Sequence, residues 1–206
     1  MTSNNATRVE WIVQIRQEIH ETTTAIMQEA IQRGGSALGS VPRPIDTIAS
    51  VLGTHVADVS QEWLHGNKGL CTENAILVDD HDGRDWVRRF TVAHELGHQW
   101  LGPDAEEWEC NAFAGSLLIP DTDVRKELER RHLGQSSEPL EQWARYEQGG
   151  GLVTQLVRRY RVGYGAMIWA LADYGWVSGV APWTSLAYGA SLYEQYEHFY
   201  HQPRLS

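Results

Sequence analysis

The sequence predicts an α+β fold that is mostly helical, with one small antiparallel sheet and a helical C-terminal segment. Long stretches carry apolar residues at intervals of three and four, which is typical of amphipathic helices. Short runs of alternating or β-branched residues are confined to residues 54–79. The chain has 206 residues, 42% of them hydrophobic, and can therefore bury a substantial core. We expect a core of residues 1–125, on which residues 126–206 pack to form one compact unit.

Charge and cysteine content narrow the class of protein. The formal net charge of −10 argues against direct contact with nucleic acid or with an anionic membrane as the main role. The polar N-terminus does not resemble a signal peptide, and the longest apolar run, residues 166–172, is too short to cross a bilayer. Two cysteines, Cys71 and Cys110, provide no disulfide framework. These features together predict a cytoplasmic protein.

The N-terminal third predicts helices followed by the sheet. Residues 8–33 form one long amphipathic helix, which ends at the Gly-Gly-Ser of residues 34–36. A short helix follows at residues 44–53. Strands are expected at residues 54–59 and 75–78, and the segment 69–73 between them is expected to pair as well. An exposed edge of such a sheet could hold an extended peptide as an added strand.

The next helix contains the sequence H-E-x-x-H. Its apolar stripe consists of Trp86, Phe90, Ala93, Gly97 and Trp100. His94 and His98 are four residues apart, so that they lie one turn apart on a neighbouring face and can bind one metal ion. Glu95 lies roughly 100° around the helix from His94. From there it can take a proton from a metal-activated water without being a ligand, as in metallopeptidases.

Chance is the competing explanation of this motif. With nine histidines in the chain, a fortuitous H-E-x-x-H has a probability on the order of a few per cent. A match on an amphipathic helix is less easily accidental, but a hydrolytic zinc site also needs a third protein ligand. We assign no ligand role to the dispersed His55, His65 and His81.

The third ligand is expected on a second helix that begins near Asp104, after Gly102-Pro103, and ends at Pro120. Glu106, Glu107 and Glu109 are the candidates. We choose Glu107, because Asn111 lies one turn further on the same face and can hydrogen-bond one of the histidines. An alternative role for Glu107 is a capping box with Asp104, which has the right spacing.

Cys110, in the same helix, could bind zinc as a thiolate. A free cysteine on an apolar helix is more often a small buried residue, and we assign Cys110 to the core.

Residues 84–120 resemble the ImmA/IrrE family of metallopeptidases. The two blocks that carry the resemblance are R-R-F-T-V-A-H-E-L-G-H and E-x-E-C-N-A-F-A-G-S-L-L-I-P, in the family's order. The resemblance implies a zincin-like, gluzincin-type peptidase core with His94, His98 and Glu107 as zinc ligands and Glu95 as the catalytic acid and base. It also implies a substrate class, the helix-turn-helix repressors of the XRE type, whose cleavage releases a stress-response, phage or mobile-element programme.

The region after Pro120 is predicted to be helical. Asp121 caps a charged helix at residues 122–132, which we interpret as a solvated face. Residues 137–139 indicate the start of another helix, and the glycine run at residues 149–151 indicates a break.

Residues 152–160 and 164–174 predict two short helices joined by a tight turn, a spacing compatible with a DNA-binding helix-turn-helix. The second helix has no Arg or Lys to contact bases or phosphates, and its apolar sequence predicts burial instead. The aromatic-rich residues 186–200 predict a terminal helix, or alternatively a partner surface.

The sequence thus predicts a zinc-dependent endopeptidase that acts on a protein, with manganese as an alternative metal. The second hypothesis is a non-catalytic regulatory module, in which the metal stabilises a fold that binds a repressor or another protein without cleaving it.

Overall fold

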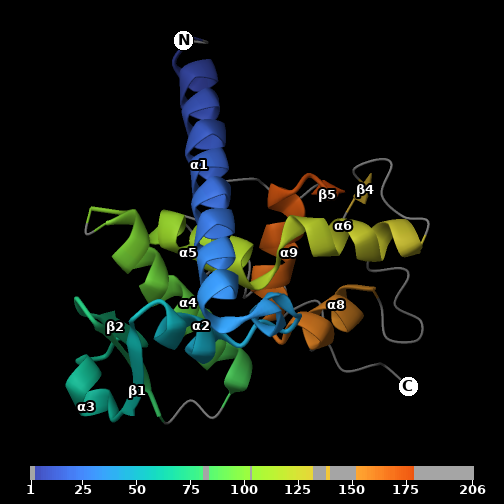
Figure 1. The fold of residues 1–206 in the computed structure, drawn as a ribbon. Coiled ribbons are helices and arrows are strands. Elements are labelled where there is room, and N and C mark those ends of the chain that lie inside the picture. The colour runs from blue at the N-terminus through green and yellow to red at the C-terminus, as the bar shows by residue number, and fades with distance from the viewer. Residues whose placement is uncertain (1–2, 81–83, 103, 132–137, 140–151, 179–206) are drawn as a thin grey trace, which may run out of the picture.

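The computed structural model describes residues 3–80, 84–102, 104–131, 138–139 and 152–178 (Figure 1). Its elements are α1 (Ser3–Gly34), a 3-10 turn (Ser36–Gly39), α2 (Ile45–Val51), β1 (His55–Val59), α3 (Gln61–Leu64), β2 (Gly69–Cys71), β3 (Ala75–Asp79), α4 (Asp85–Leu101), α5 (Glu107–Leu118), α6 (Asp121–Arg130), β4 (Glu138–Pro139), α8 (Leu152–Tyr160), α9 (Tyr164–Asp173) and β5 (Val177–Ser178). Helices dominate, and the main sheet is small. The predicted α+β class is therefore confirmed.

The main sheet is mixed rather than antiparallel throughout. Its strand order is β1-β3-β2. β2 and β3 form an antiparallel hairpin, in which the Thr72 hydroxyl donates to the Ala75 carbonyl at 3.0 Å. β1 lies parallel to β3, with His55 opposite Ala75. The prediction of an antiparallel sheet was wrong for β1. The chain reverses direction after β1 and again within the hairpin, so that β3 runs parallel to β1. β2 is left as an edge strand.

Two arginines of the motif R-R-F-T hold α4 between the sheet and the C-terminal helices. Arg88 donates to Asp46 of α2 at 2.8 Å and to Asp58 of β1 at 2.7 Å. The adjacent Arg89 is buried, and its Nε donates to the carbonyl of Arg161 at 3.2 Å. These contacts fix both the position and the rotation of the helix that carries H-E-x-x-H.

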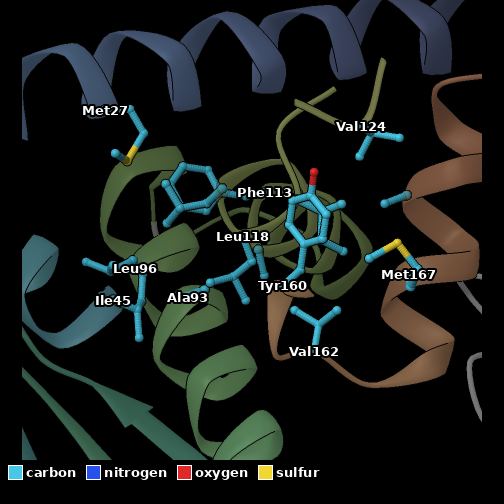
Figure 2. Close-up of a cluster of buried hydrophobic side chains, with 14 of the residues drawn as sticks. Met27, Ile45, Ala93, Leu96, Phe113, Leu118, Val124, Tyr160, Val162 and Met167 are labelled. Carbon is cyan, nitrogen blue, oxygen red and sulfur yellow. The ribbon is translucent and has the colours of Figure 1, made fainter. Parts of the chain in front are cut away.

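The core is centred on α4 and α5, whose inner faces are completely buried at Ala93, Leu96, Phe113 and Leu118. Figure 2 shows side chains from the N-terminal helix α1 and from the region of α8 and α9 packing around them. The surrounding residues include Met27, Ile45, Val124, Tyr160, Val162 and Met167. The predicted burial of the helix at 164–174 is confirmed at Met167 and Leu171, both fully buried. α8 and α9 therefore share one core with the helix of the motif.

Several predicted boundaries hold, and others need correction. The helices at 8–33, 44–53, 152–160 and 164–174 correspond to α1, α2, α8 and α9, and α4 ends at Leu101, as predicted. The residue directly after α4, Gly102, has a φ of 102°, a backbone conformation that favours glycine.

Two predicted helix starts are wrong. The next helix begins at Glu107 rather than after Asp104, and residues 138–139 form a strand, because they pair with β5. The glycine run at 149–151 and the aromatic tail at 186–200 lie outside the described residues. Within the described part of the chain, we find no helix with the length and apolar character needed to cross a membrane.

Candidate metal centre

The start of α5 directs Glu107 toward α4. The Glu109 side chain accepts a hydrogen bond from the backbone N–H of Glu106 at 2.7 Å, and these two residues form the capping box of the helix. The capping box considered for Asp104 and Glu107 is therefore not the one that forms. Two of the three candidate glutamates are occupied in capping, and Glu107 is the one that faces the histidines.

The structure brings His94, His98 and Glu107 together. The Glu107 carboxylate lies 3.2 Å from Nε2 of His94 and 3.5 Å from Nε2 of His98. One ligand atom from each of the three residues lies within 4.8 Å of the others, a grouping that could hold a metal ion. The Glu107 side chain is 78% exposed, whereas that of His94 is 15% exposed. The cluster is consequently anchored on the buried side and open to solvent on the other.

Asn111 fixes the orientation of the His94 ring. Its Oδ1 lies 3.0 Å from Nδ1 of His94, which assigns the donating proton to Nδ1. Burial lowers the pKa of His94, although Glu107 opposes the shift, and the neutral ring then directs the lone pair of Nε2 at the Glu107 carboxylate. A cation shared by these two acceptors would stabilise their close approach. The donor set of two imidazoles and one carboxylate therefore fits a divalent metal such as zinc.

Glu95 lies beside this cluster in a more enclosed position. Its side chain is buried, with 8% of the residue exposed. Burial raises the pKa of Glu95 to about 7, the negative charge of Glu107 adds to the rise, and a hydrogen bond from the backbone of Cys71 opposes it. The bond from Cys71 connects the edge strand β2 directly to the carboxylate predicted to be the catalytic acid and base.

Glycine is required where β2 passes Glu95. A Cβ atom on Gly69 would lie 2.6 Å from Cγ2 of Thr91 and 2.8 Å from Oε1 of Glu95. Any larger residue would displace either the strand or the carboxylate. The backbone of the edge strand therefore lies directly against the side chains of Thr91 and Glu95 in α4.

Gln99, directly after the second histidine, links α4 to the residue before β1 and to the turn between β2 and β3. Its Nε2 donates to the carbonyl of Thr72 at 2.8 Å, and its Oε1 accepts from the hydroxyl of Thr54 at 2.9 Å. Gly69, Cys71 and Gln99 were not among the residues predicted for the site. The one available signal was a glycine inside a predicted strand, which often indicates a close approach of another chain segment.

The two helices that carry the candidate ligands cross in close contact. A Cβ atom on Gly97 would lie 3.1 Å from Cα of Cys110, so that α4 and α5 approach each other at this point as nearly as their backbones allow. Cys110 is completely buried, which confirms its predicted place in the core. Because Glu107 lies one turn before Cys110, this close crossing brings its carboxylate within reach of the two histidines.

The cluster opens into a large cleft of about 1350 Å³. Parts of β2, α4, α5, α9 and α1 line it. This volume exceeds the roughly 300–1,000 Å³ of small-molecule pockets and suits a longer ligand.

These features together define a class. A helix with H-E-x-x-H, beside a small sheet and facing a carboxylate on the following helix, has the arrangement of gluzincin-like metallopeptidases. A family model of peptidases, Peptidase_M78, described as the IrrE N-terminal-like domain, matches residues 52–171. The chain belongs to this family, as the two sequence blocks predicted. No curated protein matches the chain. The matched segment includes all the candidate site residues but excludes α1 and the last two residues of α9.

Proposed function

We propose that this protein is a zinc-dependent endopeptidase. The observation that carries the proposal is the convergence of His94, His98 and Glu107, with the buried Glu95 next to them, in a chain of a peptidase family. His94, His98 and Glu107 would hold the metal, and Asn111 would keep the His94 ring in place. Imidazole donors favour zinc over manganese, which prefers oxygen ligands.

Zinc, when bound at such a site, lowers the pKa of water and polarises a carbonyl group. The residues of the chain supply the remaining steps. Glu95 takes the proton of the attacking water and later transfers it to the leaving amine. The hydrogen bond from the backbone of Cys71 holds the Glu95 carboxylate in position for both transfers.

The substrate is proposed to be a protein bound in extended form. β2 is an edge strand that lines the cleft with the candidate ligands, and an extended segment could pair with such an edge. The family resemblance favours an XRE-type repressor in the cytoplasm as the protein that is cleaved.

Substitution of Glu95 tests this function. Zinc content and cleavage of a panel of purified XRE-type repressors are measured for the wild type and for Glu95→Gln. We expect one zinc per chain in both proteins and a loss of cleavage of about 10²–10⁴-fold in the variant, the range for general acid–base catalysis.

Unchanged cleavage by Glu95→Gln would contradict the proposal. If both proteins bind zinc and a repressor but neither cleaves it, the non-catalytic regulatory module is the correct description.

A further inference from the structure

The cleft extends well beyond the metal cluster along α5. Asn111, Ala112, Gly115 and Ser116 follow Glu107 on the same side of this helix, and all line the cleft. From Glu107 to Ser116 the helix rises about 13 Å, at 1.5 Å per residue. An extended peptide covers that distance with about four residues.

α9 forms the wall opposite α5. Its Gly165, Ala166 and Trp169 line the cleft. At the start of this wall, a Cβ on Gly163 would lie 2.8 Å from the ring of Trp86 in α4, so that α9 begins in direct contact with the helix of the motif. A Cβ on Gly165, in contrast, would meet nothing within 4 Å. This wall is therefore anchored at its first turn and open further along.

α1 closes the far end of the chamber. Arg16 of α1 forms an ion pair with Asp173, at the end of α9. The hydroxyl of Thr23 lies 2.7 Å from that of Ser116 in α5. Helix α1 thus contacts both α9 and α5, near the C-terminal end of each.

α1 also contacts α5 at the metal end. The rings of Trp11 and Trp108 lie edge to face, 6.2 Å apart, next to Glu107. α1 is therefore a boundary of the cleft along its whole length.

The lining of this chamber is predominantly apolar, although Gln17, His20 and Ser116 also border it, and the acidic groups Asp173 and Asp121 are paired. Asp173 pairs with Arg16, and Asp121 accepts hydrogen bonds from Arg125 at 3.2 Å and from Trp176 at 3.0 Å. The apolar groups that face the chamber are Val13, Phe90, Ala112, Ala166 and Trp169. A charged side chain would lose its hydration here without gaining an unpaired partner among these acids, whereas a large apolar side chain would be buried.

We propose that the chamber bounded by α5, α9 and α1 is a specificity subsite, which selects a large apolar side chain of the protein substrate within about four residues of the cleaved bond. This inference rests on the proposed peptidase function, because the chamber is continuous with the metal cluster. Arg16 and Asp173, which join two of its walls, both lie outside the segment shared with the family. The family match alone therefore does not imply this selectivity.

A library of acetylated and amidated random peptides, each with one position fixed as Phe, Leu, Ala or Lys, provides the test. Retention is measured on immobilised, zinc-loaded Glu95→Gln protein, and cleavage is measured with the wild type. We expect Phe and Leu peptides to be retained at least about tenfold better than Ala or Lys peptides, as is typical of a hydrophobic pocket. Cleavage should place the apolar residue within about four positions of the bond.

Filling the chamber should abolish this preference. A Cβ on Gly115 would meet nothing within 4 Å, so that Gly115→Leu can place its side chain in the cleft without a clash. Ala166→Phe fills the opposite wall as a second variant, and Ala25→Leu adds bulk to an exposed position of α1 as a matched control. Thermal unfolding establishes that each variant is folded. The preference should fall about tenfold or more in the two chamber variants and persist in Ala25→Leu.

The two proposals can fail separately. The subsite is wrong, and the peptidase function stands, if the wild type cleaves peptides without an apolar preference near the bond. The same conclusion follows if both folded chamber variants keep the preference for Phe and Leu peptides. If Glu95→Gln retains Phe peptides selectively while the wild type cleaves none, the peptidase function is wrong, and the chamber is an apolar binding site rather than a specificity subsite of a peptidase. Equal retention of all four peptide classes overturns the subsite whether or not cleavage occurs.

Discussion

The two faces of α5 differ in how closely they are packed. On one face, Cys110 touches Gly97 of α4 so closely that a Cβ on Gly97 would lie only 3.1 Å from Cα of Cys110. On the other face, Gly115 borders the cleft, and a methyl group there would meet nothing within 4 Å. One helix therefore has a close-packed side, which brings the candidate ligands together, and an open side, which leaves room for a ligand.

The two faces of α5 meet different requirements: the close-packed face positions the candidate metal ligands, and the open face borders the proposed binding cleft. The contact between α4 and α5 lies wholly within the segment shared with the M78 peptidase family. The open side is completed by α1 and by the end of α9, which that segment does not include. Metal binding needs ligand positions fixed to fractions of an ångström, whereas the walls of a binding cleft can change with the substrate.

The largest effect is expected where the close-packed side ends, at Glu107. Glu107→Gln removes the charged member of the candidate ligand set, and zinc measured by elemental analysis should fall from about one per chain to a small fraction of that. Glu106→Gln is the matched control, because its carboxylate belongs to the capping box. It should retain zinc and lose about 1 kcal/mol of stability.

Stoichiometric zinc in Glu107→Gln together with loss of zinc in Glu106→Gln would reverse the assignment. Equal binding in both variants would show that neither glutamate is a ligand. Zinc retained by a His94→Ala protein as tightly as by the wild type would contradict the cluster as a whole.

The second prediction concerns the open side, where Asp173 pairs with Arg16. Burial raises the pKa of Asp173 to about 6, although Arg16 opposes the shift. The ordinary value in an unfolded chain is about 3.9. Because the folded protein binds this proton more tightly, the associated stability is complete below about pH 4 and is lost as the pH rises through about 6. The difference corresponds to about 3 kcal/mol at 1.36 kcal/mol per pKa unit.

Denaturant unfolding at several pH values measures this effect. The free energy of unfolding of the wild type relative to Asp173→Asn should fall by up to about 3 kcal/mol between about pH 4 and pH 7. Taking the difference removes the contributions of all groups that titrate equally in both proteins. A constant or rising difference would show that the pair is solvated and does not close the cleft.

Local spacing was sufficient to predict which candidate ligands the structure brings together. His94 and His98 lie on one face because the helix repeats every 3.6 residues, and Asn111 follows Glu107 by one turn for the same reason. Spacing could not select the capping box, because Asp104 with Glu107 and Glu106 with Glu109 are both three residues apart. The capping box forms between Glu106 and Glu109 because α5 begins at Glu107, and local spacing does not determine this start.

Contacts between distant segments were not predictable. The parallel pairing of β1 depends on two chain reversals, and the approach of Gly69 to Glu95 joins residues that are far apart in the sequence. The charged helix at 122–132, predicted to be a solvated face, buries Glu127 between hydrogen bonds from Arg130 and Arg131, each at 2.7 Å. A pattern of charges does not reveal which of them find partners within the fold.

The smallest effects are expected from the same substitution, glycine to alanine, at the close-packed contact of α5 with α4 and on the open face of α5. Gly97→Ala places a methyl group 3.1 Å from Cα of Cys110, so that α4 and α5 must separate by a few tenths of an ångström. The overpacking should cost about 1–3 kcal/mol and outweigh the helix propensity of alanine, which contributes up to about 1 kcal/mol. Gly115→Ala adds its methyl group to open space in a helix, where alanine is favoured over glycine by up to about 1 kcal/mol. Thermal unfolding should therefore give a lower Tm for the first variant and a higher Tm for the second.

Zinc affinity should fall with Gly97→Ala alone, since separating the helices moves Glu107 away from the histidines. Equal shifts in both variants would mean that the two faces of α5 are packed alike, and the distinction between a close-packed chemical face and an open binding face would have to be abandoned.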